Sequence, residues 1–222
     1  MNPDFQRARQ PEQKEQRRAH LLETARGQLA SGVPLRALSL SELARQAGMA
    51  KANVYTYFES REALLLALLW DAWQQWFQAL QAAPRSRRRR AETLDDVADE
   101  LARTLSSAPL LGELTAALPT VLEQNLSEAA IRAFKHDARA LFGEVAAHLA
   151  LRSPHLPPSA YAELLHDAAH AIMGLYPATH PAPAAARALE DPALHFFRRD
   201  FATELRRFVR ALAAAHAARA RP

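Results

Sequence analysis

The sequence contains no cysteine and little glycine, and these two features narrow the classes of protein to consider. Without cysteine the chain has no disulfide bond, no thiolate nucleophile, no thiol redox sensor and no cysteine-based zinc site. Glycine occurs only 6 times while alanine and leucine dominate, a mixture that favours helices. The 14 prolines fall mostly between apolar runs, where they end helices. The composition therefore predicts an all-α protein.

Long hydrophobic segments are also lacking. Residues 1–20 are polar and charged, without the apolar core of a signal peptide. The longest strongly apolar run, residues 63–70, is too short to span a bilayer and is closed by Asp71. We therefore expect a cytoplasmic protein with no membrane partner. The formal net charge of +4 permits binding to nucleic acid or to another anionic surface without requiring it.

Hydrophobic periodicity divides the chain into a small helical domain and a larger helical body. Residues 1–11 read as a flexible basic tail, residues 12–62 as three helices with short connections, and residues 63–222 as the body, which starts with a long helix to about residue 83. Further helices are predicted over residues 93–106, 109–118, 120–124, 127–151, 159–176 and 193–218.

Residues 40–58 have the spacing of a helix-turn-helix. Small Ala44 and Ala47 allow two helices to approach closely, and Gly48 can adopt the left-handed backbone that reverses the chain. The outward side chains of the predicted helix 51–58 are donors, acceptors and aromatic hydroxyls rather than a solubilising mixture of Glu and Lys. This pattern predicts a helix that enters the major groove of duplex DNA.

Residues 18–69 resemble the N-terminal domain of the tetracycline-repressor (TetR) family. The motifs that carry the resemblance are Ser39, Leu43-Ala44-Arg45-Gln46-Ala47-Gly48-Met49, Tyr55-Thr56-Tyr57-Phe58 and Ser60-Arg61-Glu62-Ala63-Leu64. The chain departs from the family pattern at Ala50, Ala52 and Arg61, where Ser, Gly and Lys are frequent. Beyond residue 69 only the layout is similar, a variable all-helical body whose last two helices dimerise.

The resemblance implies a set of DNA-contacting residues. Asn53 is the first choice for a specifying contact, because an Asn side chain can bond an adenine edge in two places. Lys51 is expected at a base edge or a phosphate, since folding does not favour a positive charge at a helix start. Tyr55, Tyr57, Ser39 and Arg61 match backbone-clamping positions, although Tyr55 can alternatively be a core residue. The complete predicted set is Ser39, Ser41, Lys51, Ala52, Asn53, Tyr55, Thr56, Tyr57 and Arg61.

The last two long helices carry unusually wide apolar surfaces. A helix that is apolar on more than one side must bury both, one against its own core and the other against a partner subunit. We therefore predict a homodimer; a central helix of a monomeric bundle is the alternative. The predicted interface residues are Leu164, Ala168, Ile172, Phe197, Phe201, Leu205 and Phe208.

The long helix after the helix-turn-helix is rich in aromatic residues. Trp70, Trp73 and Phe77 share one stripe and are expected to be buried, whereas Trp76 is expected to be exposed or interfacial. In the resembled family this helix links an effector pocket to the DNA-reading unit. We expect a small apolar effector, bordered by a set of residues for which ordinary core packing is the alternative. The set is Trp73, Phe77, Leu114, Leu118 and His170.

Glu163, His166 and His170 lie on one face of a predicted helix, at a spacing that can hold a metal ion. Only one such motif occurs, so we interpret the two histidines as partly buried, hydrogen-bonded residues of the interior and expect no metal and no cofactor. A metalloprotein or enzyme that uses this cluster is the alternative function. No glycine-rich phosphate loop, Gly-x-Ser-x-Gly elbow or catalytic triad is found, so we expect no enzyme activity.

Five arginines at positions 85 and 87–90 are interpreted as a solvated linker. Taken together, the sequence predicts an N-terminal three-helix helix-turn-helix domain joined by a long helix to a ligand-binding and dimerisation bundle. Such a protein would be a repressor that binds an inverted-repeat operator as a homodimer and is released by a small molecule. A basic helical protein that binds anionic membranes or any nucleic acid is a further alternative.

Overall fold

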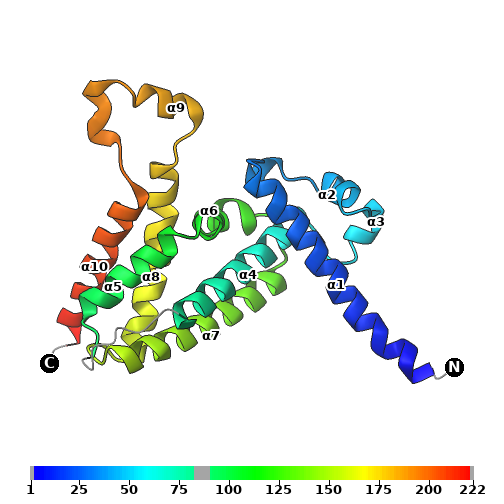
Figure 1. Ribbon diagram of the computed structural model, residues 1–222, viewed down its shortest axis with the longest axis horizontal. Helices are drawn as coiled ribbons and strands as arrows, with labels where there is room; N and C mark the ends of the chain where they lie inside the picture. Colours follow the sequence, from blue (N-terminus) through cyan, green and yellow to red (C-terminus); the bar gives the residue numbers. More distant parts are fainter. Residues whose placement is uncertain (1–2, 83–90, 221–222) are drawn as a thin grey trace. The chain divides into compact units, whose positions relative to one another are not determined.

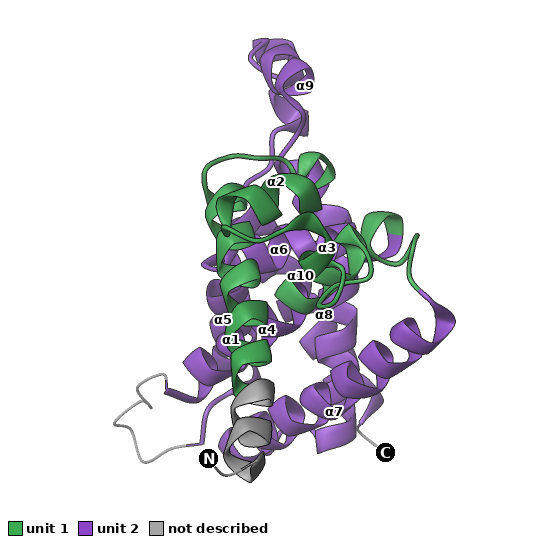
Figure 2. Cartoon of the chain, turned by 90° about the vertical axis from the view of Figure 1, so that its right-hand side faces the viewer, with its two compact units in different colours: residues 1–68, 120–126 green, residues 69–119, 127–222 purple. Residues whose placement is uncertain are grey.

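A computed structural model describes residues 3–82 and 91–220 of the chain, and the side chains from residue 12 onward. Within these ranges the secondary structure is helical and no strand occurs, as the composition predicts. The chain forms two compact units (Figure 2). Unit 1 comprises residues 1–68 and 120–126, and unit 2 comprises residues 69–119 and 127–222. The arginines at positions 85 and 87–90 lie outside the described residues.

Unit 1 contains the N-terminal helices. In chain order these are α1 (Pro3–Ala30), the short 3₁₀ helix η1 (Leu35–Ala37), α2 (Leu40–Gln46), α3 (Lys51–Val54) and the first part of α4 (Arg61–Ala82). The boundary between the units falls after Leu68, later in α4 than the sequence suggests. α2 packs against both α1 and α3, which makes it the centre of this unit.

The start of α1 differs from the prediction. A flexible tail is expected over residues 1–11, but α1 begins at Pro3. Gln, Arg and Ala, which are good helix formers, fill residues 6–10 of this segment, so only Pro11 opposes its continuation into the rest of the helix. At the other end α1 stops at Ala30, followed by Gly32 with a φ of 92°.

The core of unit 1 consists of aliphatic and aromatic side chains at helical spacing. Each leucine, valine or phenylalanine among them contributes about 1.5–3 kcal/mol when it is fully removed from water, which is how such a small unit holds short helices in place. The principal buried residues are Leu21, Leu22, Ala25, Leu38, Leu43, Ala44, Val54, Phe58, Leu64, Leu65 and Leu68.

Unit 2 is a bundle built around one central helix. Besides the rest of α4, its helices are α5 (Leu94–Ser106), α6 (Pro109–Ala117), α7 (Glu128–Arg152), α8 (Pro158–Thr179), α9 (Pro183–Ala188), the 3₁₀ helix η3 (Pro192–Phe197) and α10 (Phe201–Arg219). A π-helical turn, η2 (Leu118–Leu122), follows α6 and runs into the segment assigned to unit 1. α8 contacts α6, α7 and α10, and α10 also packs along α5 (Figure 1).

Close packing between α6 and α8 depends on one glycine. A Cβ atom at Gly112 would lie 2.6 Å from the Tyr176 ring, a distance that real Cβ atoms do not adopt. The absence of a side chain at this position therefore lets the α8 ring approach the α6 backbone directly.

Polar side chains tie the helices of unit 2 together. The Trp76 indole N–H donates to the Thr104 hydroxyl of α5 over 3.0 Å. Arg152 at the end of α7 forms ion pairs with Glu92 and Glu100 while only 10% of its side chain is exposed. Asp99 of α5 accepts hydrogen bonds from Arg206 and Arg210, which both lie on α10. These pairs fix how α5, α7 and α10 meet.

Two expectations for the body are wrong. Trp76 is 7% exposed rather than exposed or interfacial, because α5 covers the face of α4 that carries it. The predicted helix 193–218 is broken, since η3 ends at Phe197 and α10 begins at Phe201. The Asp200 carboxylate accepts a hydrogen bond from the Thr203 backbone N–H and so caps the start of α10.

Within residues 3–82 and 91–220, no single helix is both long enough and apolar enough to cross a bilayer. Two consecutive helical segments, Leu94–Ser106 and Pro109–Leu122, meet the length and composition criteria only when taken together, and the chain bends by 87° between them.

Candidate functional site

α2 and α3 form a compact helix-turn-helix in unit 1. The turn depends on Gly48, whose φ of 64° lies in the left-handed region, and is closed by a 2.8 Å hydrogen bond from the Met49 N–H to the Ala44 carbonyl. Leu43 and Val54 anchor the two helices and are both fully buried. α3 itself is shorter than predicted, since it ends at Val54 and residues 55–57 form a turn.

The outer side of α3 and its following turn is polar and solvent-facing. Lys51, Asn53 and Tyr55 are exposed, and the exposed fraction of Tyr55 is 49%. Among the described residues, these three side chains form no hydrogen bond or ion pair with the protein. The core alternative for Tyr55 is therefore wrong. An exposed group of unused donors and acceptors on an anchored helix is available to an external partner.

The other predicted contacts on this face are less uniform. Ala52 is exposed but has no polar side chain, and Tyr57 is half-buried. The Thr56 hydroxyl donates to the Asn53 carbonyl over 2.6 Å, so its proton is engaged locally. Ser39 occupies the N-cap of α2 without forming the usual side-chain cap, and both Ser39 and Ser41 are exposed. Both residues lie at the start of α2.

Arg61 lies in a different environment from the one expected for a phosphate contact. Its guanidinium donates to the Arg36 carbonyl over 2.8 Å and pairs with the Glu62 carboxylate. Burial raises the pKa of Glu62, but hydrogen bonds from Arg61, from its own backbone N–H and from Asn125 outweigh burial and lower it. Each of the three guanidinium nitrogens thus has a protein partner, and Arg61 joins the start of α4 to η1.

Arg45 is an exposed cation of α2 that the sequence analysis did not single out. It pairs with Glu42, and the hydrogen bonds from Arg45 and then Gln46 lower the pKa of Glu42 to about 2. Arg45 is therefore a further exposed basic residue of the helix-turn-helix, on α2. The sequence feature that could have identified Arg45 is its position as a basic residue within the helix-turn-helix motif.

A cavity of about 430 Å³ opens between α4, α7 and α8 in unit 2. Of the five residues predicted to border an effector pocket, Trp73, Leu118 and His170 line this cavity, whereas Phe77 and Leu114 do not. Leu114 is fully buried, and Phe77 packs edge-on against His148 with ring centroids 6.1 Å apart. The lining is Trp73, Leu118, Phe134, Lys135, Ala138, Arg139, Phe142, Ala162, Glu163, His166, Ala169, His170 and Met173.

The cavity combines an aromatic floor with a charged rim. The Trp73 ring stacks on Phe134 at 5.5 Å and lies 5.2 Å from Phe142, while its indole N–H donates to Thr115. Arg139 and Lys135 of α7 are exposed at the opening. Most of the lining residues come from α7 and α8, and only the folded structure brings these two helices together at the site.

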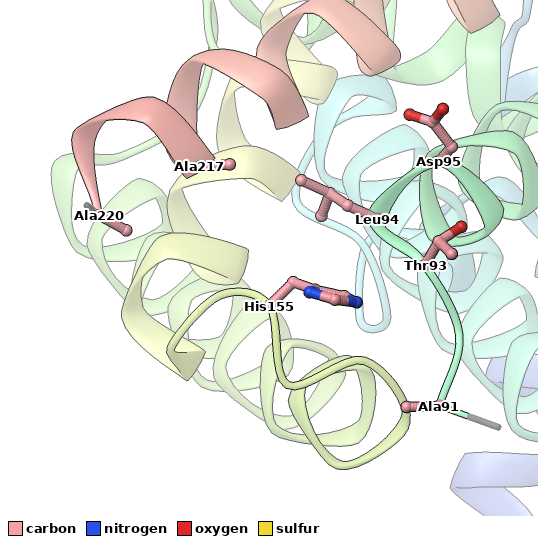
Figure 3. Close-up of a pocket in the computed structure, with 7 residues that line it drawn as sticks. All are labelled: Ala91, Thr93, Leu94, Asp95, His155, Ala217 and Ala220. Carbon is pink, nitrogen blue, oxygen red and sulfur yellow. The ribbon is translucent and has the colours of Figure 1, made fainter.

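A second cavity of about 470 Å³ lies where the start of α5, the α7–α8 connection and the end of α10 meet (Figure 3). The His155 imidazole points into it, while the Asp95 carboxylate is directed away from that ring (Figure 3). The Thr93 hydroxyl is engaged in capping α5. With one imidazole and no converging polar group, this cavity supports no functional assignment.

The predicted dimer residues separate into two groups. Five of them pack inside unit 2, because α10 of the same chain covers the second apolar face of α8. These are Leu164, Ala168, Ile172, Phe201 and Leu205, each at most 9% exposed. They are therefore not available to a partner, which corrects the expectation. Phe197 and Phe208 are exposed, by 61% and 40%.

His166 and His170 are exposed on α8, not partly buried in the interior as expected. Their rings lie 4.3 Å apart, edge to face. The reason for the error is that the helix face bearing them borders the cavity rather than the bundle core. Glu163 is 68% exposed, and its carboxylate lies 3.7 Å from the Nδ1 atom of His216 on α10.

An anchored helix-turn-helix followed by an all-helical body is the architecture of a transcription regulator that carries DNA-binding and regulatory parts in one chain. The family model described as "Bacterial regulatory proteins, tetR family" matches residues 21–68. The model described as "Tetracyclin repressor-like, C-terminal domain" matches residues 71–219. The chain belongs to the TetR family of transcriptional regulators, and its N-terminal unit is a DNA-binding helix-turn-helix domain.

Solved structures show the same fold. A TetR transcriptional regulator from Rhodococcus sp. RHA1 is 18% identical, with a TM-score of 0.55 over 90% of this chain and 97% of the other. The transcriptional regulator SCO7222, a TetR from Streptomyces coelicolor, is 17% identical, with a TM-score of 0.53 over 91% and 98%. Among curated proteins none matches the chain. At these identities the likeness concerns the fold alone.

Proposed function

We propose that the protein is a sequence-specific regulator that reads an inverted-repeat operator with α3 of each subunit of a homodimer. The observation that carries this proposal is the exposed polar face of α3, where Lys51, Asn53 and Tyr55 have no partner among the described residues. Polar groups that a protein leaves unused on a rigid helix are suited to bind the edges of base pairs and the phosphates.

Each residue of this face has a distinct proposed role. Asn53 bonds an adenine edge, because its carboxamide presents one donor and one acceptor side by side. Lys51 binds a phosphate or a guanine edge. Tyr55, Tyr57 and Ser39 donate to phosphates and set the position of the helix in the groove, with Ser41, Ala52 and Thr56 in the same contact area. Arg61 is left out of the proposal because its donors are engaged within unit 1.

The dimer is proposed to form through the exposed side of α10. Phe208, Ala211 and Ala215 follow one another at helical spacing and are all exposed, so they form an apolar stripe on the outside of unit 2. Small residues beside one large ring allow two copies of a helix to approach closely about a two-fold axis. A two-fold dimer would place its recognition helices ~34–36 Å apart, which requires an inverted repeat in the operator.

The proposed effector site is the 430 Å³ cavity of unit 2. Its aromatic floor suits a small, largely apolar molecule, and α4, which supplies Trp73, is continuous with the helix-turn-helix unit. Ligand binding would shift α4 and change the spacing of the two recognition helices. We propose that the unliganded protein represses and that the ligand releases it from DNA.

Selection of bound sequences from a pool of random duplexes tests the DNA-reading part. The proposal predicts recovery of one consensus with two-fold symmetry, bound with an affinity that falls as salt rises because phosphates are neutralised. Recovery of no consensus, with binding that disappears entirely at higher salt, would contradict it and would favour a nonspecific basic protein.

Sedimentation analysis of a Phe208→Glu variant tests the dimer. We expect this variant to be monomeric, because the change places a charge in the centre of the apolar stripe. Ala147→Glu, a charge at an exposed position of α7, is the matched control and should remain dimeric. Equal association of both variants would place the dimer contact elsewhere on the chain.

A further inference from the structure

A cluster of metal-binding side chains lies on α8 at the edge of the cavity. We propose that His166, Asp167 and His170 bind a divalent transition-metal ion. The ligand atoms of the three residues all lie within 4.8 Å of one another. The proposal is independent of the DNA-reading function, because it depends only on side chains of α8 and α10 within unit 2.

The spacing of the two histidines is suited to one ion. Residues four positions apart lie one above the other on a helix face, and two histidines in this relation form a known zinc-binding pair. Ring centroids 4.3 Å apart show that the imidazoles of His166 and His170 are already side by side. Bonds of ~2.0–2.1 Å from zinc to each nitrogen need only a small rotamer adjustment. Both side chains are exposed and are free to make it.

Asp167 is positioned by a residue from another helix. The His216 Nε2 atom of α10 lies 2.9 Å from one carboxylate oxygen of Asp167. His216 is only 4% exposed, so this contact is part of the packing between α8 and α10. A carboxylate ligand that is also hydrogen-bonded on its other side is held in place for the ion, as outer partners hold the ligands of established metal sites. Asp167 keeps its second oxygen for the metal.

The donor set indicates the class of ion. Two imidazoles with one carboxylate match zinc, nickel, cobalt or copper, whereas magnesium and calcium prefer all-oxygen sites. Three protein ligands leave at least one coordination position, which is typical of sites that also bind water or a small molecule. His166 and His170 line the cavity, so the open position is next to the space assigned to the effector.

Titration of the metal-stripped full-length protein with zinc chloride tests the proposal. We expect one saturable zinc site per chain. His166→Ala or His170→Ala should lower the affinity by at least about 100-fold, since loss of an outer partner alone already costs roughly 10–100-fold. His155→Ala is the matched control, because His155 is an exposed histidine of the other cavity, and its zinc affinity should equal that of the wild type.

Two results would overturn the proposal. One is the lack of saturable zinc binding by the wild type, and the other is equal binding by the wild type and His170→Ala. Because the two histidines are exposed, these substitutions should leave the helical circular-dichroism signal and the unfolding temperature unchanged.

An Asp167→Asn variant tests the carboxylate separately. The two histidines should still bind cobalt(II), but the visible absorption spectrum of the cobalt-loaded protein should change, because one oxygen ligand is lost. A spectrum identical to that of the wild type would remove Asp167 from the site.

Discussion

Polar side chains are treated differently in the helix-turn-helix and in the bundle. In unit 2 the Trp73 and Trp76 indoles donate to Thr115 and Thr104, and Arg152 is bound by two glutamates. On α3, Lys51 and Asn53 have no partner among the residues that the structure describes. Folding thus uses these polar groups of the bundle and leaves those of α3 unused.

The difference indicates where each region has its partner. A buried polar group without a hydrogen bond costs about 1–3 kcal/mol, which explains why the buried indoles and the Arg152 guanidinium of the bundle have partners within the chain. An exposed polar group on α3 needs no hydrogen-bond partner within the protein, because water forms hydrogen bonds with it until DNA replaces the water. The short α3 is anchored by core contacts, since Val54 of α3 and Leu43 of α2 are fully buried. Four substitutions test this division between framework and contact residues.

Leu43→Ala should have the largest effect, because it removes the framework under α3. Leu43 is fully buried, and deletion of a buried leucine side chain costs about 2–5 kcal/mol. We expect a clear fall in the free energy of unfolding measured with denaturant, together with loss of operator binding. Leu151→Ala removes the same atoms at a position that is 88% exposed and should leave both unchanged. Similar losses in the two variants would contradict the assignment of Leu43 to the core.

Trp76→Phe should lower the stability of the bundle without changing the contacts made to DNA. The change removes the donor that bonds the Thr104 hydroxyl and leaves a small void, at a cost of about 1–3 kcal/mol. Thermal unfolding measures this loss. Trp70→Phe, at a half-buried site, should cost less. If Trp70→Phe lowers the stability more than Trp76→Phe does, the hydrogen bond from the Trp76 indole to Thr104 is not a main contribution to the stability of the bundle.

Lys51→Ala should weaken DNA binding without changing the stability of the protein. One phosphate contact is lost in each subunit of the proposed dimer, so the slope of log affinity against log salt should fall by about 1.8 and the affinity by roughly tenfold to 100-fold. The measurement is operator affinity at several salt concentrations. Arg103→Ala, an exposed cation of α5, serves as the control and should bind as the wild type does. An unchanged slope in Lys51→Ala would remove Lys51 from the DNA contact.

Asp99→Asn should have the smallest effect, and that effect should depend on pH. Hydrogen bonds from Arg206 and Arg210 hold the pKa of Asp99 well below its usual range. A carboxyl group with a lowered pKa in the folded protein stabilises it above the unfolded pKa of about 3.9 and loses this contribution as pH falls. The wild type should be more stable by less than about 1 kcal/mol at neutral pH, because the pairs are partly exposed. In acid the two proteins should converge; a difference independent of pH would contradict the ion-pair explanation.

The features that could be predicted from the sequence are those set by local chemistry. The turn at Gly48 was predictable because glycine readily adopts the positive φ that the turn requires. The helical spacing of apolar residues identifies α2 and α3. The all-helical fold and its family follow from the same local patterns. The polar face of α3 was predictable because Val54 and Phe58 mark the opposite, buried side.

Features that depend on distant contacts could not be predicted. Arg61 bonds the Arg36 carbonyl, 25 residues away in the chain, and so is part of the framework rather than an evident phosphate contact. Trp76 lies off the main stripe of α4, and only the position of α5 shows that it is buried. Asp167 could not be singled out, because its contact with His216 of α10 arises only in the fold. In each case the deciding partner belongs to another helix.

The most direct test of the central claim is base-specific readout by Asn53. Sequence selection from random duplexes should be carried out with the wild type and with Asn53→Ala. The account predicts the same two-fold symmetric consensus for both, with the preference at one base pair of each half-site lost in the variant, at a cost of about 1–3 kcal/mol. An unchanged preference at every position, or no consensus for the wild type, would contradict the claim that α3 reads the operator.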